Sequence, residues 1–140
     1  MTERAETEAL IQDAYAARYR GDLDAVMSFF HEDCSYRMSG APAPVETEAA
    51  VMFTQPSGRE AMRAQMEHFI ATFAFSNPEV LSLIVDGDKA VLNWHADVVF
   101  VPNGRQEHFE ILDIFTIVEG KIAGLVQFTD TAAVARLTAA

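Results

Sequence analysis

The fold of this chain is decided by one stretch, Phe109-Glu110-Ile111-Leu112-Asp113-Ile114-Phe115-Thr116-Ile117-Val118. The stretch is rich in β-branched and aromatic residues, which predicts a strand. Because strand side chains alternate, every second residue from Phe109 to Ile117 shares one face, and that face is apolar except for Asp113. A charged carboxylate is unfavourable among such side chains. Asp113 must therefore take up a proton, find hydrogen-bond partners or serve a function.

The composition of the chain excludes several kinds of partner. The 140 residues fit one domain spanning residues 1–140 with a core of its own, and half of them are hydrophobic. A formal net charge of -11 repels phosphate backbones and anionic membranes, so no nucleic acid and no membrane is expected as a partner. The single cysteine, Cys34, cannot form an internal disulfide. Since no leader peptide or membrane-spanning run is visible, we expect a cytoplasmic protein.

The first part of the chain predicts helices. Ile11, Tyr15 and Tyr19 recur at helical spacing within a helix over residues 3–20, which ends at Gly21. Asp22 is a favourable N-cap for a short helix that reaches residue 29 or 30. A short strand at 34–38 follows, and then a long loop from 40 to 55 of the kind that often covers a site.

A third helix is predicted after the loop. Ser57 and Glu60 have the spacing of a capping box at its start, and Asn77-Pro78 lies beyond its end. One stripe of this helix is apolar and consists of Met62, Met66, Phe69, Ile70 and Phe73. Residues 80–85, 90–101, 106–118 and 122–129 predict four strands, followed by a short helix or a tail at 131–140. Helices first and hairpins afterwards indicate an α+β fold, in which helices cover one face of a curved antiparallel sheet.

The strand register follows from Asn103-Gly104, a strong signal for a two-residue hairpin loop. With those two residues as the loop, Trp94 lies opposite Asp113, so the indole is expected beside the carboxyl group. The turn at Glu119-Gly120 leaves two alternatives open. A three-residue loop with a bulge points Gln127 and Thr129 inward beside Asp113, whereas a two-residue loop points Val126 and Phe128 inward instead.

The opposite face of the sheet is mixed, as expected for contact with solvent or a subunit. The same register places Asp97 opposite Glu110, with His95 and His108 nearby. Like charges in such a pair are unfavourable, so something must compensate them. Imidazole and carboxylate can bind a metal ion. Solvent, the histidines or a cation from a second subunit suffice more simply, so no metal site is predicted.

Several segments together resemble a known superfamily. Tyr15 and Tyr19 ahead of Gly21-Asp22-Leu23-Asp24-Ala25, and then Phe30-His31-Glu32-Asp33-Cys34-Ser35-Tyr36, are similar to the opening of a nuclear transport factor 2-like protein. The segments Gly58-Arg59-Glu60-Ala61-Met62 and Asp113-Ile114-Phe115 with Gly120-Lys121-Ile122 resemble its later helix and strand pair. The similarity is greatest to the branch that contains ketosteroid isomerase and the SnoaL-like polyketide cyclases. It implies a cone-shaped barrel of a curved antiparallel sheet, with the N-terminal helices on the concave face.

The resemblance also implies a deep apolar pocket and a homodimer formed through the sheet. Asp113 matches the oxyanion-hole Asp of ketosteroid isomerase, and Tyr15 matches its partner Tyr. The position of the general base falls on Met38, whose thioether cannot take a proton at neutral pH. The side chains expected to contact a ligand are Trp94, Met38, Phe30, Tyr36, Met66, Phe109 and Gln127.

Two functions follow from this set of residues. The first is an enzyme that acts on a small apolar carbonyl compound by proton transfer without a cofactor, as an isomerase, cyclase or dehydratase. In it Asp113 is the acid/base or oxyanion donor and Tyr15 a second donor. The second is a non-catalytic dimeric module that binds a small apolar ligand, which Met38 favours. In either case Asp113 has an alternative reading as a structural carboxyl group hydrogen-bonded to a Tyr.

Overall fold

The computed structural model describes residues 3–39 and 55–139. The loop predicted from 40 to 55 therefore lies outside the described residues, apart from its last position. The elements are α1 (Arg4–Arg20), α2 (Leu23–Ser28), β1 (Phe30–Met38), α3 (Arg59–Thr72), β2 (Phe73–Asp86), β3 (Lys89–Phe100), β4 (Arg105–Val118), β5 (Lys121–Phe128) and α4 (Thr131–Thr138). Among the described helices, none is long and apolar enough to cross a membrane.

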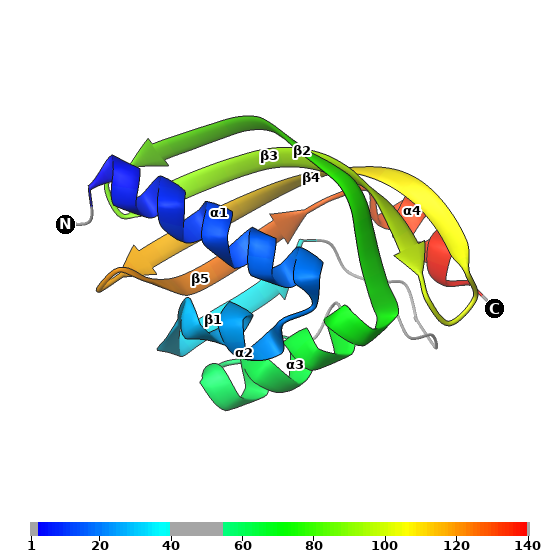
Figure 1. Cartoon of the computed structure of the whole chain (residues 1–140), viewed down its shortest axis with the longest axis horizontal. Coiled ribbons are helices and arrows are strands. Elements are labelled where there is room, and N and C mark those ends of the chain that lie inside the picture. Colours follow the sequence, from blue (N-terminus) through cyan, green and yellow to red (C-terminus); the bar gives the residue numbers. More distant parts are fainter. Residues whose placement is uncertain (1–2, 40–54, 140) are drawn as a thin grey trace.

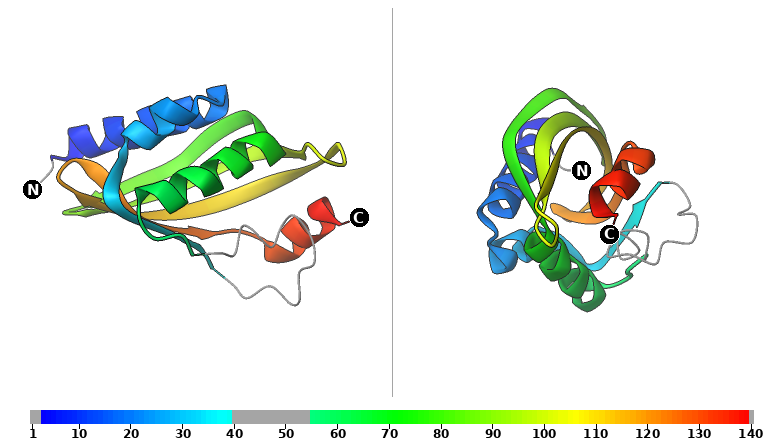
Figure 2. Two further views of the ribbon diagram at one scale, coloured as in Figure 1. Left: turned by 90° about the horizontal axis from the view of Figure 1, so that it is seen from below. Right: turned by 90° about the vertical axis from the view of Figure 1, so that its right-hand side faces the viewer.

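The five strands form one curved sheet in the order β1-β5-β4-β3-β2. The helices α1 and α3 run along its concave side, and α4 lies near the turn between β3 and β4 (Figures 1 and 2). The α+β fold with a curved sheet is thus confirmed. The sheet is open, with β1 and β2 at its edges, and it departs from the predicted antiparallel pairing at one place, where β1 pairs with β5 in parallel. A parallel pair needs a long connection, and the chain between β1 and β5 supplies it.

The start of the chain folds as its sequence predicts. Helix α1 ends at Gly21, which adopts the left-handed conformation (φ 72°) that glycine tolerates best. The Asp22 side chain then accepts a hydrogen bond from the backbone N–H of Ala25 at 3.1 Å and caps α2. These two residues turn the chain sharply, so that α1 and α2 lie side by side ahead of β1.

The predicted start of α3 is wrong, and its end lies before Asn77-Pro78 as expected but already excludes Phe73. Its N-cap is Gly58, which has no capping side chain. Ser57 instead forms a β-bridge with Ser35, which fixes its backbone outside the helix. At the other end Phe73 already belongs to β2, and this strand continues past Asn77 with a register shift between Ser76 and Glu79. Phe73 is therefore not part of the helical stripe, although it is buried in the same core.

The register of β3 and β4 differs from the prediction by two residues. Phe100 pairs with Arg105, so the turn has four residues, and Trp94 lies opposite Ile111 rather than Asp113. The Asn103 side chain explains the longer turn, because it donates hydrogen bonds to the carbonyl oxygens of Leu137 and Ala139 in and after α4. A shift of two residues preserves the faces. The predicted inner and outer side chains therefore keep their sides.

Candidate functional site

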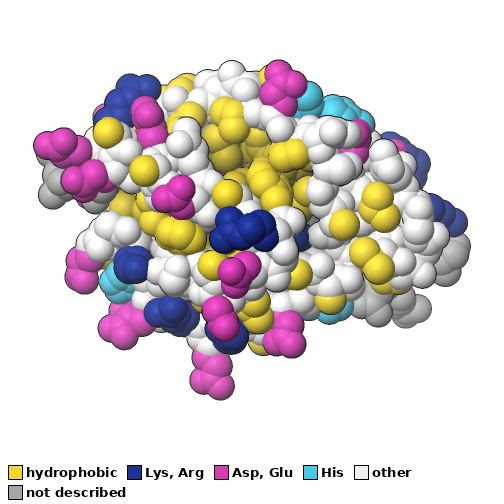
Figure 3. Space-filling model, in the orientation of Figure 1, with side chains coloured by type: hydrophobic (Ala, Val, Ile, Leu, Met, Phe, Trp, Pro, Cys, Tyr) yellow, Lys and Arg dark blue, Asp and Glu magenta, His cyan; other side chains and the backbone are white. Residues whose placement is uncertain are grey.

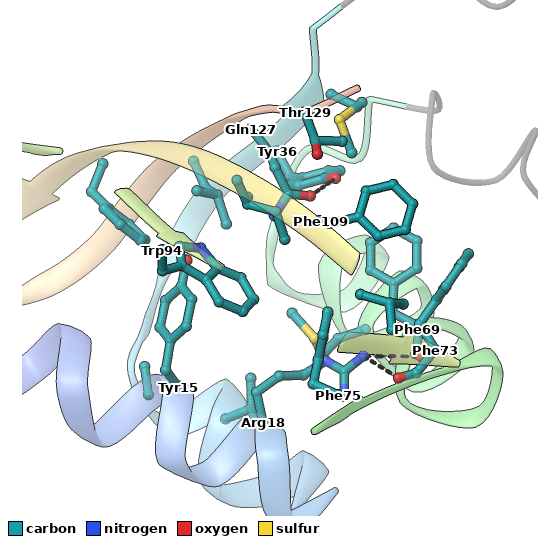
Figure 4. Close-up of a pocket in the computed structure, with 18 of the residues that line it drawn as sticks. Tyr15, Arg18, Tyr36, Phe69, Phe73, Phe75, Trp94, Phe109, Gln127 and Thr129 are labelled. Carbon is teal, nitrogen blue, oxygen red and sulfur yellow. Dashed lines mark hydrogen bonds between the residues drawn. The ribbon is translucent and has the colours of Figure 1, made fainter. Parts of the chain in front are cut away.

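A cavity of about 120 Å³ lies between the concave face of the sheet and the helices (Figure 4). An apolar cavity of about this volume can hold a single aromatic ring. Figure 3 shows hydrophobic side chains gathered in a hollow on the side of the molecule that faces the viewer in Figure 1. The described residues that line the cavity are Ala14, Tyr15, Arg18, Val26, Phe30, Tyr36, Met38, Met66, Phe69, Phe73, Phe75, Trp94, Val98, Phe109, Ile111, Phe115, Ile122, Leu125, Gln127, Thr129, Val134 and Leu137.

The predicted site residues come together here, with one exception. Those that line the cavity are Tyr15, Trp94, Met38, Phe30, Tyr36, Met66, Phe109 and Gln127. The exception is Asp113, which is 0% exposed and is not among the lining residues. A molecule in the cavity therefore meets Tyr15 and Trp94, and the carboxyl group of Asp113 lies behind them.

The Asp113 carboxyl group is held by two side chains from the cavity wall. Its Oδ2 accepts hydrogen bonds from the Tyr15 hydroxyl and from Nε1 of Trp94, the latter at 2.8 Å. Its Oδ1 is buried and has no hydrogen-bond partner of normal geometry among the described residues. Trp94 reaches the carboxyl group diagonally, because the residue directly opposite Asp113 on β3 is Leu92.

Burial raises the pKa values of both Asp113 and Tyr15. It raises the pKa of Asp113 to about 6, although hydrogen bonding to Tyr15 and Trp94, together with the nearby Gln127 amide, acts in the opposite direction. Burial, followed by the charge of Asp113 and the hydrogen bond to it, also raises the pKa of Tyr15 well above its ordinary value. The phenol therefore stays protonated at neutral pH. The carboxyl group, in contrast, can gain or lose a proton within the range in which many enzymes work.

Aromatic rings fix the position of Tyr15. Its ring meets those of Trp94, Phe115 and Tyr19 edge to face, with centroids 5.3, 6.0 and 6.2 Å away. Such pairs are favourable because the positive edge of one ring meets the negative face of another. Since Trp94 and Phe115 are buried, the hydroxyl is held in one place before any ligand arrives.

A second polar group lies across the cavity (Figure 4). The Tyr36 hydroxyl donates a hydrogen bond to Oε1 of Gln127 at 3.0 Å. Gln127 and Thr129 both line the cavity, so the inward facing of these two residues is confirmed. The three-residue loop predicted with it is wrong, because Val118 pairs with Lys121 and the turn has two residues. The inward facing comes instead from a bulge inside the strand pair, at the register shift between Thr116 and Ile117.

The sequence reasoning missed Arg18. Nη2 of its guanidinium donates hydrogen bonds to the carbonyl oxygens of Phe69 and Phe73 at 3.1 and 2.7 Å, and its carbon lies 4.6 Å from the centre of the Phe75 ring. Burial lowers the pKa of Arg18 to about 10. A signal was present in the sequence, because Arg18 follows Tyr15 by three positions and so belongs to the inward stripe of α1.

On the outer face of the sheet, each of the two carboxylates lies opposite a histidine. Asp97 lies opposite His108 and His95 opposite Glu110, so the predicted pair of Asp97 and Glu110 is wrong. Nδ1 of His108 lies 2.9 Å from Oδ1 of Asp97. Within residues 3–39 and 55–139, no group of three or more His, Cys, Asp or Glu side chains could hold a metal ion.

The curved sheet with helices on its concave side is the architecture of the nuclear transport factor 2-like proteins. The family model of the SnoaL-like domain matches residues 11–125, and the chain belongs to this family. A search of curated proteins finds no match.

Solved structures share the fold over nearly the whole chain. An NTF2-like protein from Burkholderia xenovorans LB400 is 20% identical, with 99% of each chain covered and a TM-score of 0.80. TsrD from Streptomyces laurentii is 26% identical, with 98% of this chain and 97% of that chain covered and a TM-score of 0.72. An LEH-like epoxide hydrolase from M. tuberculosis is 15% identical, with 91% of this chain and 85% of that chain covered and a TM-score of 0.72.

Proposed function

We propose that this chain binds a small apolar carbonyl compound in the cavity and catalyses proton transfer without a cofactor, as an isomerase, cyclase or dehydratase. One observation carries the proposal: the Tyr15 hydroxyl at the cavity wall is hydrogen-bonded to a fully buried Asp113. Membership of the SnoaL-like family, and similarity to proteins that include an epoxide hydrolase, support an enzyme of this general kind.

In this proposal Tyr15 touches the substrate and Asp113 acts through it. When Asp113 is charged, the Tyr15 hydroxyl donates a hydrogen bond to the carboxylate, and a lone pair of the phenol oxygen can accept a proton from the substrate. As that proton arrives, the proton of Tyr15 passes to Oδ2 of Asp113, so no free phenolate forms. The reverse sequence returns a proton to another atom of the substrate, which completes an isomerisation.

The protonated state of Asp113 serves the opposite step. A neutral Asp113 donates to the phenol oxygen, and the Tyr15 hydroxyl then turns toward a carbonyl oxygen of the ligand. Such a donor, fixed in advance and shielded from water, stabilises negative charge that develops in the transition state. The apolar walls strengthen this interaction, because few water molecules remain to screen it.

A second function, binding without catalysis, is favoured by Met38. This residue lines the cavity where the family resemblance expects a general base, and a thioether cannot accept a proton from carbon. In that case the Tyr15–Asp113 pair serves only to hold an oxygen atom of the ligand.

Proton exchange separates the two functions. The probes are cyclohexanone and 2-cyclohexenone in D₂O, with exchange at the carbon beside the carbonyl followed by NMR, and binding measured in parallel. We expect Tyr15→Phe to lower the exchange rate by about 10²-fold or more, because it removes the one hydroxyl that bonds to Asp113. The control is Tyr36→Phe, which removes the hydroxyl bonded to Gln127 and should lower the rate by less than about tenfold.

The outcomes are distinct. Probes that bind without faster exchange than in buffer would overturn the enzyme and leave the binding module. Probes that do not bind at millimolar concentration would overturn both functions. An equal loss in Tyr15→Phe and Tyr36→Phe would remove the special role given to the Tyr15–Asp113 pair.

A further inference from the structure

We propose that Arg18 binds an acidic group of the ligand, so that the cavity takes a small cyclic or aromatic carboxylic acid. The proposal rests on the proposed function in one respect, that a small molecule occupies this cavity. It adds the chemical class of that molecule and does not depend on whether proton transfer follows.

Arg18 is the single charged side chain among the described residues that line the cavity. No carboxylate in the described part of the chain forms an ion pair with it. A partly buried cation without a counter-ion is unfavourable, and a ligand carboxylate would offset this. The rest of the molecule cannot attract an anion, because its formal net charge is -11. A preference for acids would therefore have to come from this one residue.

The guanidinium group of Arg18 is held in place by hydrogen bonds, but not all of its donors take part in them. Its two hydrogen bonds within the described residues, to the carbonyl oxygens of Phe69 and Phe73, both come from Nη2. The Nε and Nη1 donors have no partner among the described residues. Figure 4 shows the group held beside Phe75 at the edge of the cavity. An arginine positioned in this way loses little freedom when a carboxylate arrives.

A purely structural role would be to cap the end of α3. Arginine favours the C-terminal end of a helix because carbonyl oxygens and the negative end of the helix dipole lie there. The chain contains a matched example, since Arg105 donates to the carbonyl oxygens of Arg136 and Ala139 at the end of α4 from an exposed position. Capping does not require burial. What distinguishes Arg18 from Arg105 is the cavity.

Tyr15 adds a second requirement on the ligand. Residues three apart on a helix are neighbours, with Cβ atoms roughly 5–6 Å apart. A ring that presents an oxygen to Tyr15 and a carboxylate to Arg18 would therefore span these two side chains. Around both groups the walls are apolar and aromatic, which suits a hydrocarbon ring.

The test compares acids with neutral amides of the same shape. The probes are benzoate with benzamide, and cyclohexanecarboxylate with cyclohexanecarboxamide, with dissociation constants measured at pH 7.5 by NMR titration. For the native sequence we expect each acid to bind between about 10- and 100-fold more tightly than its amide, the range for a charge-assisted hydrogen bond. Binding of the acid should also shift the Nε–H signal of Arg18.

The variants are Arg18→Met, Arg18→Lys and Arg105→Met. We expect Arg18→Met to lose the preference for acids while its affinity for the amides stays within about threefold, because the apolar walls remain. Arg18→Lys should keep part of the preference, and Arg105→Met all of it. The native-sequence comparison and the Nε–H shift decide the question even where Arg18→Met fails to fold.

Failure of this proposal differs from failure of the proposed function. Amides and acids that bind equally to the native sequence, or a preference that survives in Arg18→Met, would overturn the role of Arg18 and leave ligand binding intact. If none of the four probes binds while 2-cyclohexenone does, the proposal for acids is wrong and the proposed function stands. If 2-cyclohexenone fails to bind as well, both proposals are wrong.

Discussion

The two faces of the sheet each hold a carboxyl group, and the pKa values of these two groups are shifted in opposite directions. Asp113 on the inner face accepts two hydrogen bonds, from Tyr15 and Trp94, and burial raises its pKa to about 6. Asp97 on the outer face also has two partners, His108 at 2.9 Å and Asn77 at 3.2 Å. The hydrogen bonds to His108 and Asn77 lower the pKa of Asp97 below its ordinary value.

This difference shows which effect controls the inner face. The two carboxyl groups lie on adjacent strands and have the same number of side-chain partners, so hydrogen bonding alone does not explain the opposite directions. Removal of water does, because it penalises the charged form of Asp113 more than its partners stabilise it. Asp113 therefore gains or loses its proton near neutral pH, whereas Asp97 is already ionised there.

The largest expected effect is on the pH dependence of folding. A pKa of about 6 instead of 3.8 means that the folded state holds a proton that the unfolded chain has lost. The free energy of unfolding due to this group should therefore fall by roughly 3 kcal/mol as pH rises from about 4 to about 7. In Asp113→Asn this fall should be absent, as measured by urea unfolding at a series of pH values.

The control for this prediction is Asp97→Asn. Because the pKa of Asp97 is lowered, its contribution is present above the ordinary pKa and is lost as pH falls. Its removal should leave the fall between pH 4 and 7 in place. The same fall in Asp113→Asn as in the native sequence would mean that burial does not control the inner carboxyl group.

The inner face was also the part that sequence could predict. Alternation identified the buried side of β4, and the family resemblance brought Tyr15 to Asp113. The alternation of strand side chains is a local rule, so it survived a register error of two residues in β3 and β4. The exact register was not predictable, because Asn103 bonds to α4, a segment more than thirty residues away.

Neither the position of Arg18 at the cavity nor the position of Asp113 behind the cavity wall could be predicted from the alternation of strand side chains. Arg18 is explained by contacts with Phe69 and Phe73, which approach it only when the end of α3 and the start of β2 come to lie beside α1. Asp113 was correctly expected on the apolar face, but only tertiary packing determines that Tyr15 and Trp94 stand between it and the cavity. A sequence gives the face on which a residue lies more readily than its distance from a ligand.

A smaller effect is expected from the indole that holds Asp113. Trp94→Phe removes the Nε1 donor, and we expect the free energy of unfolding to fall by about 2 kcal/mol at pH 8, where the carboxyl group is charged. The loss should be smaller at pH 4.5, where Asp113 is neutral. The pKa of Asp113, followed by ¹³C NMR of its carboxyl carbon, should rise further.

The control for the indole is Phe115→Leu. Phe115 packs on the Tyr15 ring and is fully buried, but it donates no hydrogen bond to the carboxyl group. Its replacement should destabilise the protein equally at both pH values. An equal loss at pH 4.5 and pH 8 in Trp94→Phe would show that the indole contributes packing alone.

We propose that two copies of the chain associate through the outer face of the sheet. A substitution there is expected to have the smallest effect on the stability of the protomer. Paired positions place Ile84, Val91, Ile114 and Val126 in one row across four adjacent strands. Ile84 is 58% exposed, and apolar rows of this kind commonly mark interfaces. We expect the native sequence to have twice the protomer mass in light scattering, and Ile114→Glu to have the mass of one protomer.

The matched control is Val101→Glu, which puts the same charge on an exposed side chain in the β3–β4 turn, outside the row. It should leave the dimer intact. Because Ile114 faces outward, its substitution should change the stability of the separated protomer by less than about 1 kcal/mol, unlike the changes around Asp113. A native protein that is monomeric at micromolar concentration would rule out this dimer, and the outer row would then simply face solvent.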